Sequence, residues 1–192
     1  MASPYFDRAV AGLISLIAEE QRRYAAKPSY EEVVEISEFR PTRHAKPEVS
    51  ADREGAFRRG VAYEYTKSLY AQDWFDSSTE RTVANVLDQA EEVSFWVRLQ
   101  RKDLPILWAE GRNYEPDFVV VEKDDAHWVV EVKMDKEMKS EDVQGKREAA
   151  QRWANHVSAT ETVGAKWRYL LVSEADIKTA KGSWAALKKL GS

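Results

Sequence analysis

The sequence predicts an α/β fold in which a mixed β-sheet is flanked by helices. Three observations support this fold class. A helix-period segment over residues 78–90 precedes a series of short β-branched and aromatic runs, a second helical pattern covers 141–157, and one more strand pattern follows at 167–172. Successive hairpins followed by one helical crossover place antiparallel and parallel neighbours in the same sheet.

The overall composition is that of a globular protein. The 192-residue chain is 43% apolar and 32% charged, which is sufficient for one domain with a sizeable core. It has no cysteine, so disulfides and thiolate metal sites are excluded, and its three histidines lack a metal-ligand spacing. The sequence has no apolar run near the roughly 20 residues of a membrane span and no signal-peptide pattern. We therefore expect a cytoplasmic protein without a membrane partner.

The first third of the chain, residues 1–62, is typical of an accessory arm with helical and extended parts. It contains a helical pattern over residues 3–24, a strand pattern over 32–39 and a polar, basic, irregular stretch over 41–60. We place the boundary with the core domain after residue 62, so that residues 63–192 form the core.

The core elements follow in chain order, each predicted from its own pattern of apolar residues. The helix over 78–90 carries an apolar stripe at spacings of three and four, formed by Val83, Val86, Leu87 and Ala90. Four extended segments come next, at 93–99, 104–108, 118–121 and 128–132. A helix over 141–157, a strand over 167–172 and a helix over 185–190 complete the domain.

Basic residues are concentrated in two short stretches, although the net charge is −4. From Arg40 to Arg59 there are six Lys or Arg against three acids, and residues 178–189 hold four lysines and no acid. Such runs are commonly solvated faces, but locally basic surfaces also bind phosphate. The candidate nucleic-acid contacts in the first stretch are Arg40, Arg43, Arg58 and Arg59.

Three charged residues interrupt an otherwise apolar hairpin in the segment YEPDFVVVEKDDAHWVVEVK, residues 114–133. Asp117 opens the first strand, and Glu131 and Lys133 lie two apart in the second strand, hence on one face. A hairpin of this size brings the two carboxylates to one end of the sheet. Paired carboxylates suit a hard divalent cation, and an adjacent lysine stabilises a hydroxide or a phosphate charge. The set therefore favours metal-assisted phosphodiester hydrolysis.

The acid-x-Lys triplet is not specific by itself. It occurs three times, at 131–133, 137–139 and 176–178, and a salt-bridged face of an edge strand would also explain it. Only the first lies in a strand-like apolar run with a Pro-Asp ahead of the partner strand. That context favours the catalytic interpretation over the structural one.

Two further polar residues have two interpretations each. Glu80 heads the apolar stripe of its helix and is either an upstream metal ligand or the partner of Ser77 in a capping box. Lys146 lies in the apolar stripe of the helix over 141–157, so it either extends to solvent or reaches toward a phosphate in the site. Periodicity alone does not decide between these alternatives.

These residues resemble a known family. Pro116-Asp117, followed after a hairpin by Glu131-Val132-Lys133 within an α-β-β-β-α-β order, resembles the PD-(D/E)xK nuclease superfamily. More narrowly, the segments SLYAQDWFDSSTERTVANVLDQ, YEPDFVVV, WVVEVK and KREAAQRWA are similar to the C-terminal endonuclease domain of type III restriction enzyme Res subunits and related helicase-nucleases. The resemblance covers residues 68–157.

The resemblance implies a restriction-endonuclease-like core and Mg²⁺-dependent hydrolysis of DNA, with Mn²⁺ able to substitute. Asp117 and Glu131 would hold the metal together with the backbone carbonyl of Val132, and Lys133 would position and activate the attacking water. Glu80 falls where the superfamily often has a further acidic ligand. Lys146 falls where the following helix often carries a polar residue that faces the site, here a candidate DNA contact.

One feature of the related enzymes is missing from this sequence. They carry an ATP-driven helicase or translocase, whereas this sequence has no phosphate-binding loop. We expect such a module elsewhere in a full-length protein or in a partner chain of a restriction-modification or helicase-nuclease system. Two alternatives stay open: a non-catalytic DNA-docking module of the same fold, favoured by the basic stretch 40–59, and a nuclease of RNA or repair intermediates.

Overall fold

The computed structural model describes residues 48–50, 55–161 and 163–191. The chain divides into two compact units, 1–35 and 36–192, and all described residues belong to the second. The helix expected over 3–24, the strand expected over 32–39, and Arg40 and Arg43 lie outside the described residues. The division of the chain at residue 62 therefore stays a prediction.

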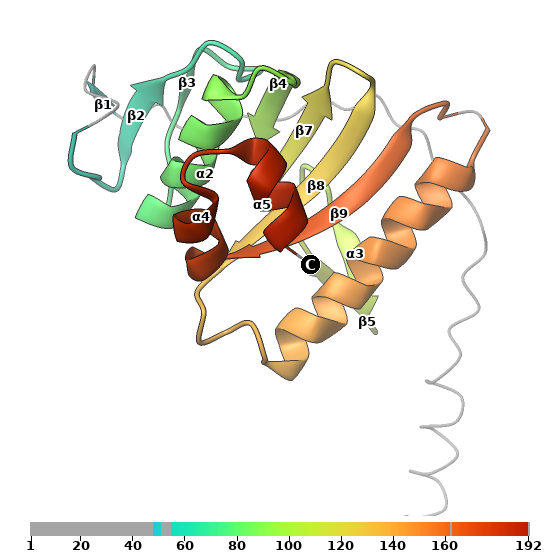
Figure 1. Ribbon diagram of the computed structural model, residues 1–192. Helices are drawn as coiled ribbons and strands as arrows, with labels where there is room; N and C mark the ends of the chain where they lie inside the picture. The colour runs from blue at the N-terminus through green and yellow to red at the C-terminus, as the bar shows by residue number, and fades with distance from the viewer. Residues whose placement is uncertain (1–47, 51–54, 162, 192) are drawn as a thin grey trace, which may run out of the picture. The chain divides into compact units, whose positions relative to one another are not determined.

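A four-stranded mixed sheet forms the centre of the described unit (Figure 1). Its strand order is β4-β7-β8-β9, with β4 at Val93–Arg98, β7 at Phe118–Glu122, β8 at Ala126–Lys133 and β9 at Lys166–Ser173. The pairs β4·β7 and β7·β8 are antiparallel, and β8·β9 is parallel. The parallel pair follows from the helix between the two strands, because parallel neighbours need a crossover connection. The predicted mixed sheet is confirmed.

The helices begin at serine caps and match the predicted helical segments. Helix α2 spans Ser78–Gln89, α3 spans Glu141–Ala159 and α5 spans Trp184–Leu190. Their N-cap residues are Ser77, Ser140 and Ser183, and each accepts a hydrogen bond from a backbone N–H three residues on. A cap of this kind satisfies one of the N–H groups that a helix start leaves free. Among the described residues, no helix is both long and apolar enough to cross a bilayer.

Alternating residues of β8 face two different cores, which is why the strand is apolar on both faces. Val130 and Val132 pack in one core with residues of α2 and α5 such as Leu87 and Trp184. Val129 packs in the other core, with residues of α3 such as Ala150. Helices therefore cover both faces of the sheet, in the predicted order α2-β4-β7-β8-α3-β9.

One predicted strand does not belong to the central sheet. The segment expected at 104–108 is β5, Ile106–Ala109, and it pairs with β6, Arg112–Tyr114, in a separate two-stranded hairpin. This hairpin packs on α3, where a Cβ atom on Gly145 would lie only 3.2 Å from the Trp108 ring. The side-chain pattern of a short strand does not reveal its pairing partner, so the sequence did not separate this hairpin from the sheet.

Helix α4 and three further short strands were not predicted. Helix α4, Glu174–Ala180, starts directly after β9 because Ser173 and Asp176 form a capping box at the strand end. Residues 48–50, inside the stretch expected to be irregular, form β1, Glu48–Ser50. This strand pairs in parallel with β2, Val61–Glu64, which in turn pairs with β3, Gln72–Asp73.

Candidate active site

The backbone of Asp117 is inserted between two strands at one end of the sheet. Its N–H donates to the carbonyl of Val130 in β8 (3.1 Å), and its carbonyl accepts from the N–H of Leu99 beside β4 (2.8 Å). Pro116 comes next toward the N-terminus and has no N–H with which to continue the ladder. Backbone pairing therefore begins at Asp117, one residue before β7, and the two hydrogen bonds fix its position from both sides.

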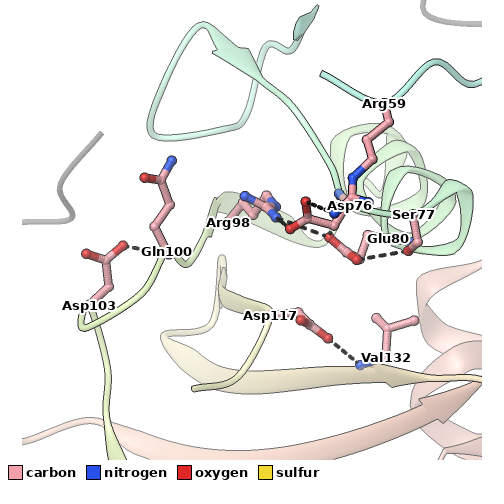
Figure 2. Close-up of polar contacts among 9 residues, drawn as sticks. All are labelled: Arg59, Asp76, Ser77, Glu80, Arg98, Gln100, Asp103, Asp117 and Val132. Atoms are coloured by element: carbon pink, nitrogen blue, oxygen red, sulfur yellow. Dashed lines mark hydrogen bonds and ion pairs between the residues drawn. The ribbon is translucent and has the colours of Figure 1, made fainter. Parts of the chain in front are cut away.

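The carboxylate of Asp117 binds the edge of β8 that β7 leaves uncovered. The pairing of β7 with β8 ends at Phe118 and Val130, and beyond it the Val132 N–H donates to Asp117 Oδ2 at 2.7 Å (Figure 2). In an extended strand the N–H and C=O groups of one residue point toward the same side. The Val132 carbonyl therefore lies along the same sheet edge as the Asp117 carboxylate.

Glu131 lies in β8, opposite Asp117. One step beyond the pair of Phe118 with Val130, which ends the β7·β8 pairing, Asp117 and Glu131 are opposite each other. The Glu131 residue is 4% exposed, and its Oε1 pairs with the ammonium group of Lys133. Its second oxygen, Oε2, is buried and has no hydrogen-bond partner among the described residues. The structure thus brings Asp117, Glu131 and Lys133 together, as the sequence predicted.

In their ionised forms, the two carboxylates at this largely buried site would carry one more charge than the single ammonium group balances. Burial first, and then the nearby charge of Asp117, raise the pKa of Glu131 to about 8, while Lys133 opposes the shift. Burial also raises the pKa of Asp117 to about 6, against the charge of Lys133 and with a contribution from Glu80. An added divalent cation would stabilise the ionised form of both carboxylates and so oppose both shifts.

Lys133 is charged at neutral pH. Burial alone would lower its pKa, but the charges of Glu131 and Asp117 outweigh burial and raise the pKa above its ordinary value. A protonated ammonium group donates hydrogen bonds and does not accept a proton. Lys133 is therefore suited to hold a water molecule or a phosphate oxygen, and not to act as a base.

Glu80 is bound at the start of α2. Its Oε1 accepts from the Ser77 hydroxyl at 2.9 Å, and its backbone N–H donates back to that hydroxyl at 3.1 Å. Its Oε2 accepts from the Asp76 N–H at 3.3 Å and pairs with Arg98 (Figure 2). Ser77 therefore caps the helix, but the capping box is incomplete, because the backbone N–H that Glu80 accepts from is that of Asp76 and not that of Ser77. The charge of Glu80 also raises the pKa of Asp117. Among the described residues, no group of three or more acidic or histidine side chains is gathered for a metal, so the structure does not place Glu80 with the other two carboxylates.

Sequence reasoning missed Arg98, which borders the site at the end of β4. Its Nη2 lies 2.8 Å from Asp76 Oδ2 and 3.3 Å from Glu80 Oε2, and its side chain is only 10% exposed. Asp76 also pairs with Arg59 at 3.2 Å, so a row of ion pairs leads from the surface to Glu80 (Figure 2). The charge of Arg98 lowers the pKa of Asp117. The sequence pattern that could have identified Arg98 is its spacing of two from Trp96, which places both side chains on the same face of the strand.

The predicted nucleic-acid contacts have different surroundings. Lys146 is partly buried in α3, its Nζ lies 5.3 Å from the centre of the Trp108 ring, and its charge lowers the pKa of Glu131. It is therefore near the site, as one of its two interpretations required. Arg58 and Arg59 are exposed just before β2.

The oxygen donors at this sheet end fit a Mg²⁺ ion. The two carboxylates and the Val132 carbonyl are hard ligands, and the buried Glu131 Oε2 has no partner among the described residues. Mg²⁺ usually keeps several waters and takes only one or two carboxylates from a protein. A set without Glu80 is therefore sufficient for this cation.

Fold and site together define a class of protein. An α-β-β-β-α-β core that brings Pro-Asp and Glu-x-Lys to one end of its sheet is a restriction-endonuclease-like nuclease domain. The family model described as "Endonuclease domain" matches residues 66–173, more than half of the chain, and the chain belongs to this family. No curated protein matches the chain. The matched region runs to the end of β9. It includes Asp117, Glu131 and Lys133, which together are called the carboxylate–lysine set.

Proposed function

We propose that this endonuclease domain hydrolyses DNA phosphodiester bonds in a metal-dependent reaction, with Asp117, Glu131 and Lys133 at its centre. One observation carries the proposal. Two carboxylates with raised pKa values face each other beside a charged lysine, and one buried carboxylate oxygen has no partner among the described residues. Such an arrangement costs folding free energy and is retained where an external group completes it.

The residues have distinct tasks in this reaction. Asp117 and Glu131, with the Val132 carbonyl, would hold Mg²⁺ or Mn²⁺, which when bound supplies Lewis-acid stabilisation of the phosphate charge. Lys133 donates a hydrogen bond that orients the attacking water. The water oxygen forms a bond to phosphorus while one P–O ester bond breaks, and a water proton is returned to the leaving oxygen through solvent. Glu80 and Arg98 set the charge around Asp117 from the helix side.

DNA is the proposed substrate, and basic residues around the site would bind its phosphates. Lys146 is the nearest candidate because its charge already acts on Glu131. Arg58 and Arg59 are exposed and so available to a backbone phosphate, and we keep Arg40 and Arg43 as further candidates. Phosphate contacts of this kind give affinity without sequence preference.

The proposed biological setting rests on the resemblance to type III restriction enzymes and helicase-nucleases. In that setting an ATP-dependent helicase or translocase module delivers DNA to this domain, from the same protein or a partner chain, in the cytoplasm. Co-purification of the domain's native protein with an ATPase whose activity requires DNA would support this part of the proposal.

The experiment that tests the chemistry compares three proteins on supercoiled plasmid with Mg²⁺ or Mn²⁺: the wild type, Asp117→Asn and Lys133→Met. Asp117→Asn keeps an oxygen for the Val132 N–H, and Lys133→Met keeps the aliphatic stem, so both folds should persist. We expect cleavage by the wild type alone, and none in EDTA. Cleavage that survives either substitution contradicts the assignment.

Two further measurements, DNA binding in EDTA and cleavage of other nucleic acids, separate the alternatives. DNA binding that persists in EDTA with a steep salt dependence, and no cutting with any metal, would favour a docking module. Faster cleavage of RNA or of branched DNA than of duplex DNA would redirect the substrate assignment.

A further inference from the structure

A tight turn over residues 100–103 connects β4 to the β5–β6 hairpin. The N–H of Asp103 donates to the Gln100 carbonyl at 3.0 Å, and Asp103 Oδ2 accepts from the Gln100 N–H at 2.8 Å (Figure 2). These two hydrogen bonds close the turn on itself. Its backbone is therefore held in one conformation, although its two central residues, Arg101 and Lys102, are exposed.

The turn lies at the end of the sheet that carries the carboxylate–lysine set. Strands β4 and β8 are both antiparallel to β7, so both end on the same side of the sheet. The N–H of Leu99, directly before the turn, donates to the Asp117 carbonyl at 2.8 Å. The N–H of Lys102 donates to Oε1 of Glu115, two residues before Asp117, at 2.9 Å. The turn is therefore attached at two points to the segment that leads into the site, and Arg101 is at most about 7 Å of chain from Leu99.

Lys102 has a backbone conformation that disfavours its side chain. Its φ is 75°, in the left-handed region, where glycine or asparagine is the usual residue at the third position of a turn. A lysine at this position lowers stability relative to glycine, because its Cβ atom crowds the neighbouring carbonyl oxygen. Strained residues of this kind are concentrated at functional sites. The strain therefore points to a use for the lysine side chain itself.

The two cations of the turn are available to an external anion. Neither Arg101 nor Lys102 forms an ion pair with another of the residues that the structure describes. Arg98, at the end of β4, is different, because it is 10% exposed and paired with Asp76 and Glu80. Guanidinium and ammonium groups bind phosphate oxygens through charge-assisted hydrogen bonds. An exposed, unpaired Arg-Lys step on a rigid turn beside a nuclease site is thus suited to a backbone phosphate.

We propose that Arg101 and Lys102 form a binding site for the DNA backbone, at a phosphate close to the bond that is cleaved. The turn would then position the strand over the carboxylate–lysine set. Because the turn is already rigid, binding loses little conformational entropy in the backbone. A phosphate contact carries no sequence information, so it should raise the affinity for all sequences alike. The inference rests on the proposed function for the identity of the ligand and adds a binding site to it.

The test measures DNA affinity separately from cleavage. Binding of a labelled duplex in EDTA is followed by fluorescence anisotropy over a range of salt concentrations, for Arg101→Gln, Lys102→Gly and the double variant. Lys123→Gln is the matched control, because Lys123 is also an exposed turn residue but lies between β7 and β8 at the opposite end of the sheet. We expect the double variant to bind about tenfold more weakly, with a slope of log affinity against log salt concentration that is shallower by about two. Lys123→Gln should bind like the wild type.

Two further measurements separate a binding role from a structural or catalytic one. Lys102→Gly removes the charge but favours the left-handed turn, so its thermal unfolding temperature should be at least that of the wild type. In plasmid cleavage with saturating Mg²⁺, the double variant should show a KM for DNA about tenfold higher and a kcat near that of the wild type. This pattern is expected because the variant keeps the carboxylate–lysine set.

The outcomes distinguish this inference from the proposed function. A double variant that binds DNA as tightly as the wild type overturns the inference, while cleavage by the wild type leaves the proposed function standing. Weaker binding by the double variant, beside a wild type that cleaves with no metal, supports the binding site and overturns the nuclease assignment. A wild type that neither binds nor cleaves DNA overturns both. Weaker binding that comes with a lower unfolding temperature in Lys102→Gly would indicate a structural role for the turn and overturn the inference.

Discussion

The two ends of the central sheet each bury a glutamate, and the two glutamates behave in opposite ways. Glu122 closes β7 and is 5% exposed, and Glu131, toward the end of β8, is 4% exposed. Glu122 accepts from the indole N–H groups of Trp128 (2.9 Å) and Trp184 (2.8 Å) and pairs with Lys188. Glu131 pairs with Lys133 through one oxygen and leaves the other without a partner in the described structure.

The donors around Glu122 decide the direction of its pKa shift. Burial alone would raise the pKa of Glu122, but the hydrogen bonds from Lys188, Trp128 and Trp184 outweigh it and lower the pKa. The pKa of Glu131 is raised to about 8, because burial is joined by the charge of Asp117. A buried carboxylate with a full set of donors stabilises the fold, whereas one with a free oxygen and a like charge nearby is poised to bind a ligand.

The comparison is tested most strongly by neutralising each glutamate in turn. Glu131→Gln removes a proposed metal ligand, so the activation barrier for cleavage should rise by several kcal/mol. The cleavage rate should then fall about 1000-fold. Glu122→Gln should keep the wild-type rate per folded molecule. Plasmid cleavage, normalised to the folded fraction from circular dichroism, gives both values. Equal losses in the two variants would remove the functional distinction between the sheet ends.

Stability should show the opposite order. Glu122→Gln leaves the Lys188 ammonium without its ion-pair partner between the rings of Trp128 and Trp184, and should lower the free energy of unfolding by about 3 kcal/mol. Glu131→Gln should not be destabilised in metal-free buffer at pH 8. Urea unfolding in EDTA measures both, and a stable Glu122→Gln variant would show that the Trp–Lys cluster is not a structural anchor.

The two glutamates should also give opposite pH dependences. Between its ordinary pKa of 4.5 and about 8, Glu131 is protonated in the folded state and ionised in the unfolded state. The folded state then binds more protons, so metal-free stability falls as pH rises, by at most about 1.4 kcal/mol per pH unit. The pKa of Glu122 is lowered in the folded state, so the stabilisation of the fold by this carboxylate is fully present above pH 4.5 and is lost as pH falls.

Urea unfolding of the wild type, Glu131→Gln and Glu122→Gln at several pH values measures these slopes. The advantage of Glu131→Gln over the wild type should grow from pH 5 to pH 8 in EDTA. Saturating Mg²⁺ should cancel that advantage, because a ligand that binds only the folded wild type stabilises it. A difference in unfolding free energy that does not change with pH would show that Glu131 is not the group that titrates.

The smallest effect is expected from a single DNA contact. Lys146→Met keeps the packing on Trp108 but removes the charge near Glu131, so DNA affinity should fall about threefold. The slope of log affinity against log salt concentration should become shallower by about one. Lys178→Met, on the exposed face of α4, is the matched control and should change neither value. Fluorescence anisotropy over a range of salt concentrations measures both quantities. If the two variants bind alike, Lys146 has no part in DNA binding.

Much of the fold and the centre of the site were predictable from local patterns. Alternation along β8 separates Val130 and Val132 from Glu131 and Lys133, and the pair of Glu131 with Lys133 confirms that these two share a face. Pro116-Asp117 marked the strand end at which the carboxylates meet. These features depend on neighbours two to four residues apart, which a linear pattern records directly.

Other features were decided only when distant segments packed together. The sequence does not show that Glu122 accepts hydrogen bonds from Trp184 and Lys188, which lie 62 and 66 residues away. It also does not show that one oxygen of Glu131 has no partner in the part of the chain that the structure describes. Nor does it show that Glu80 joins Arg98 at the helix start. Periodicity determines which face a side chain takes, and so the sequence alone located the carboxylate–lysine set. Tertiary packing determines which donors reach each buried charge, and so only the structure distinguished the carboxylate that anchors the fold from the one available to a cation.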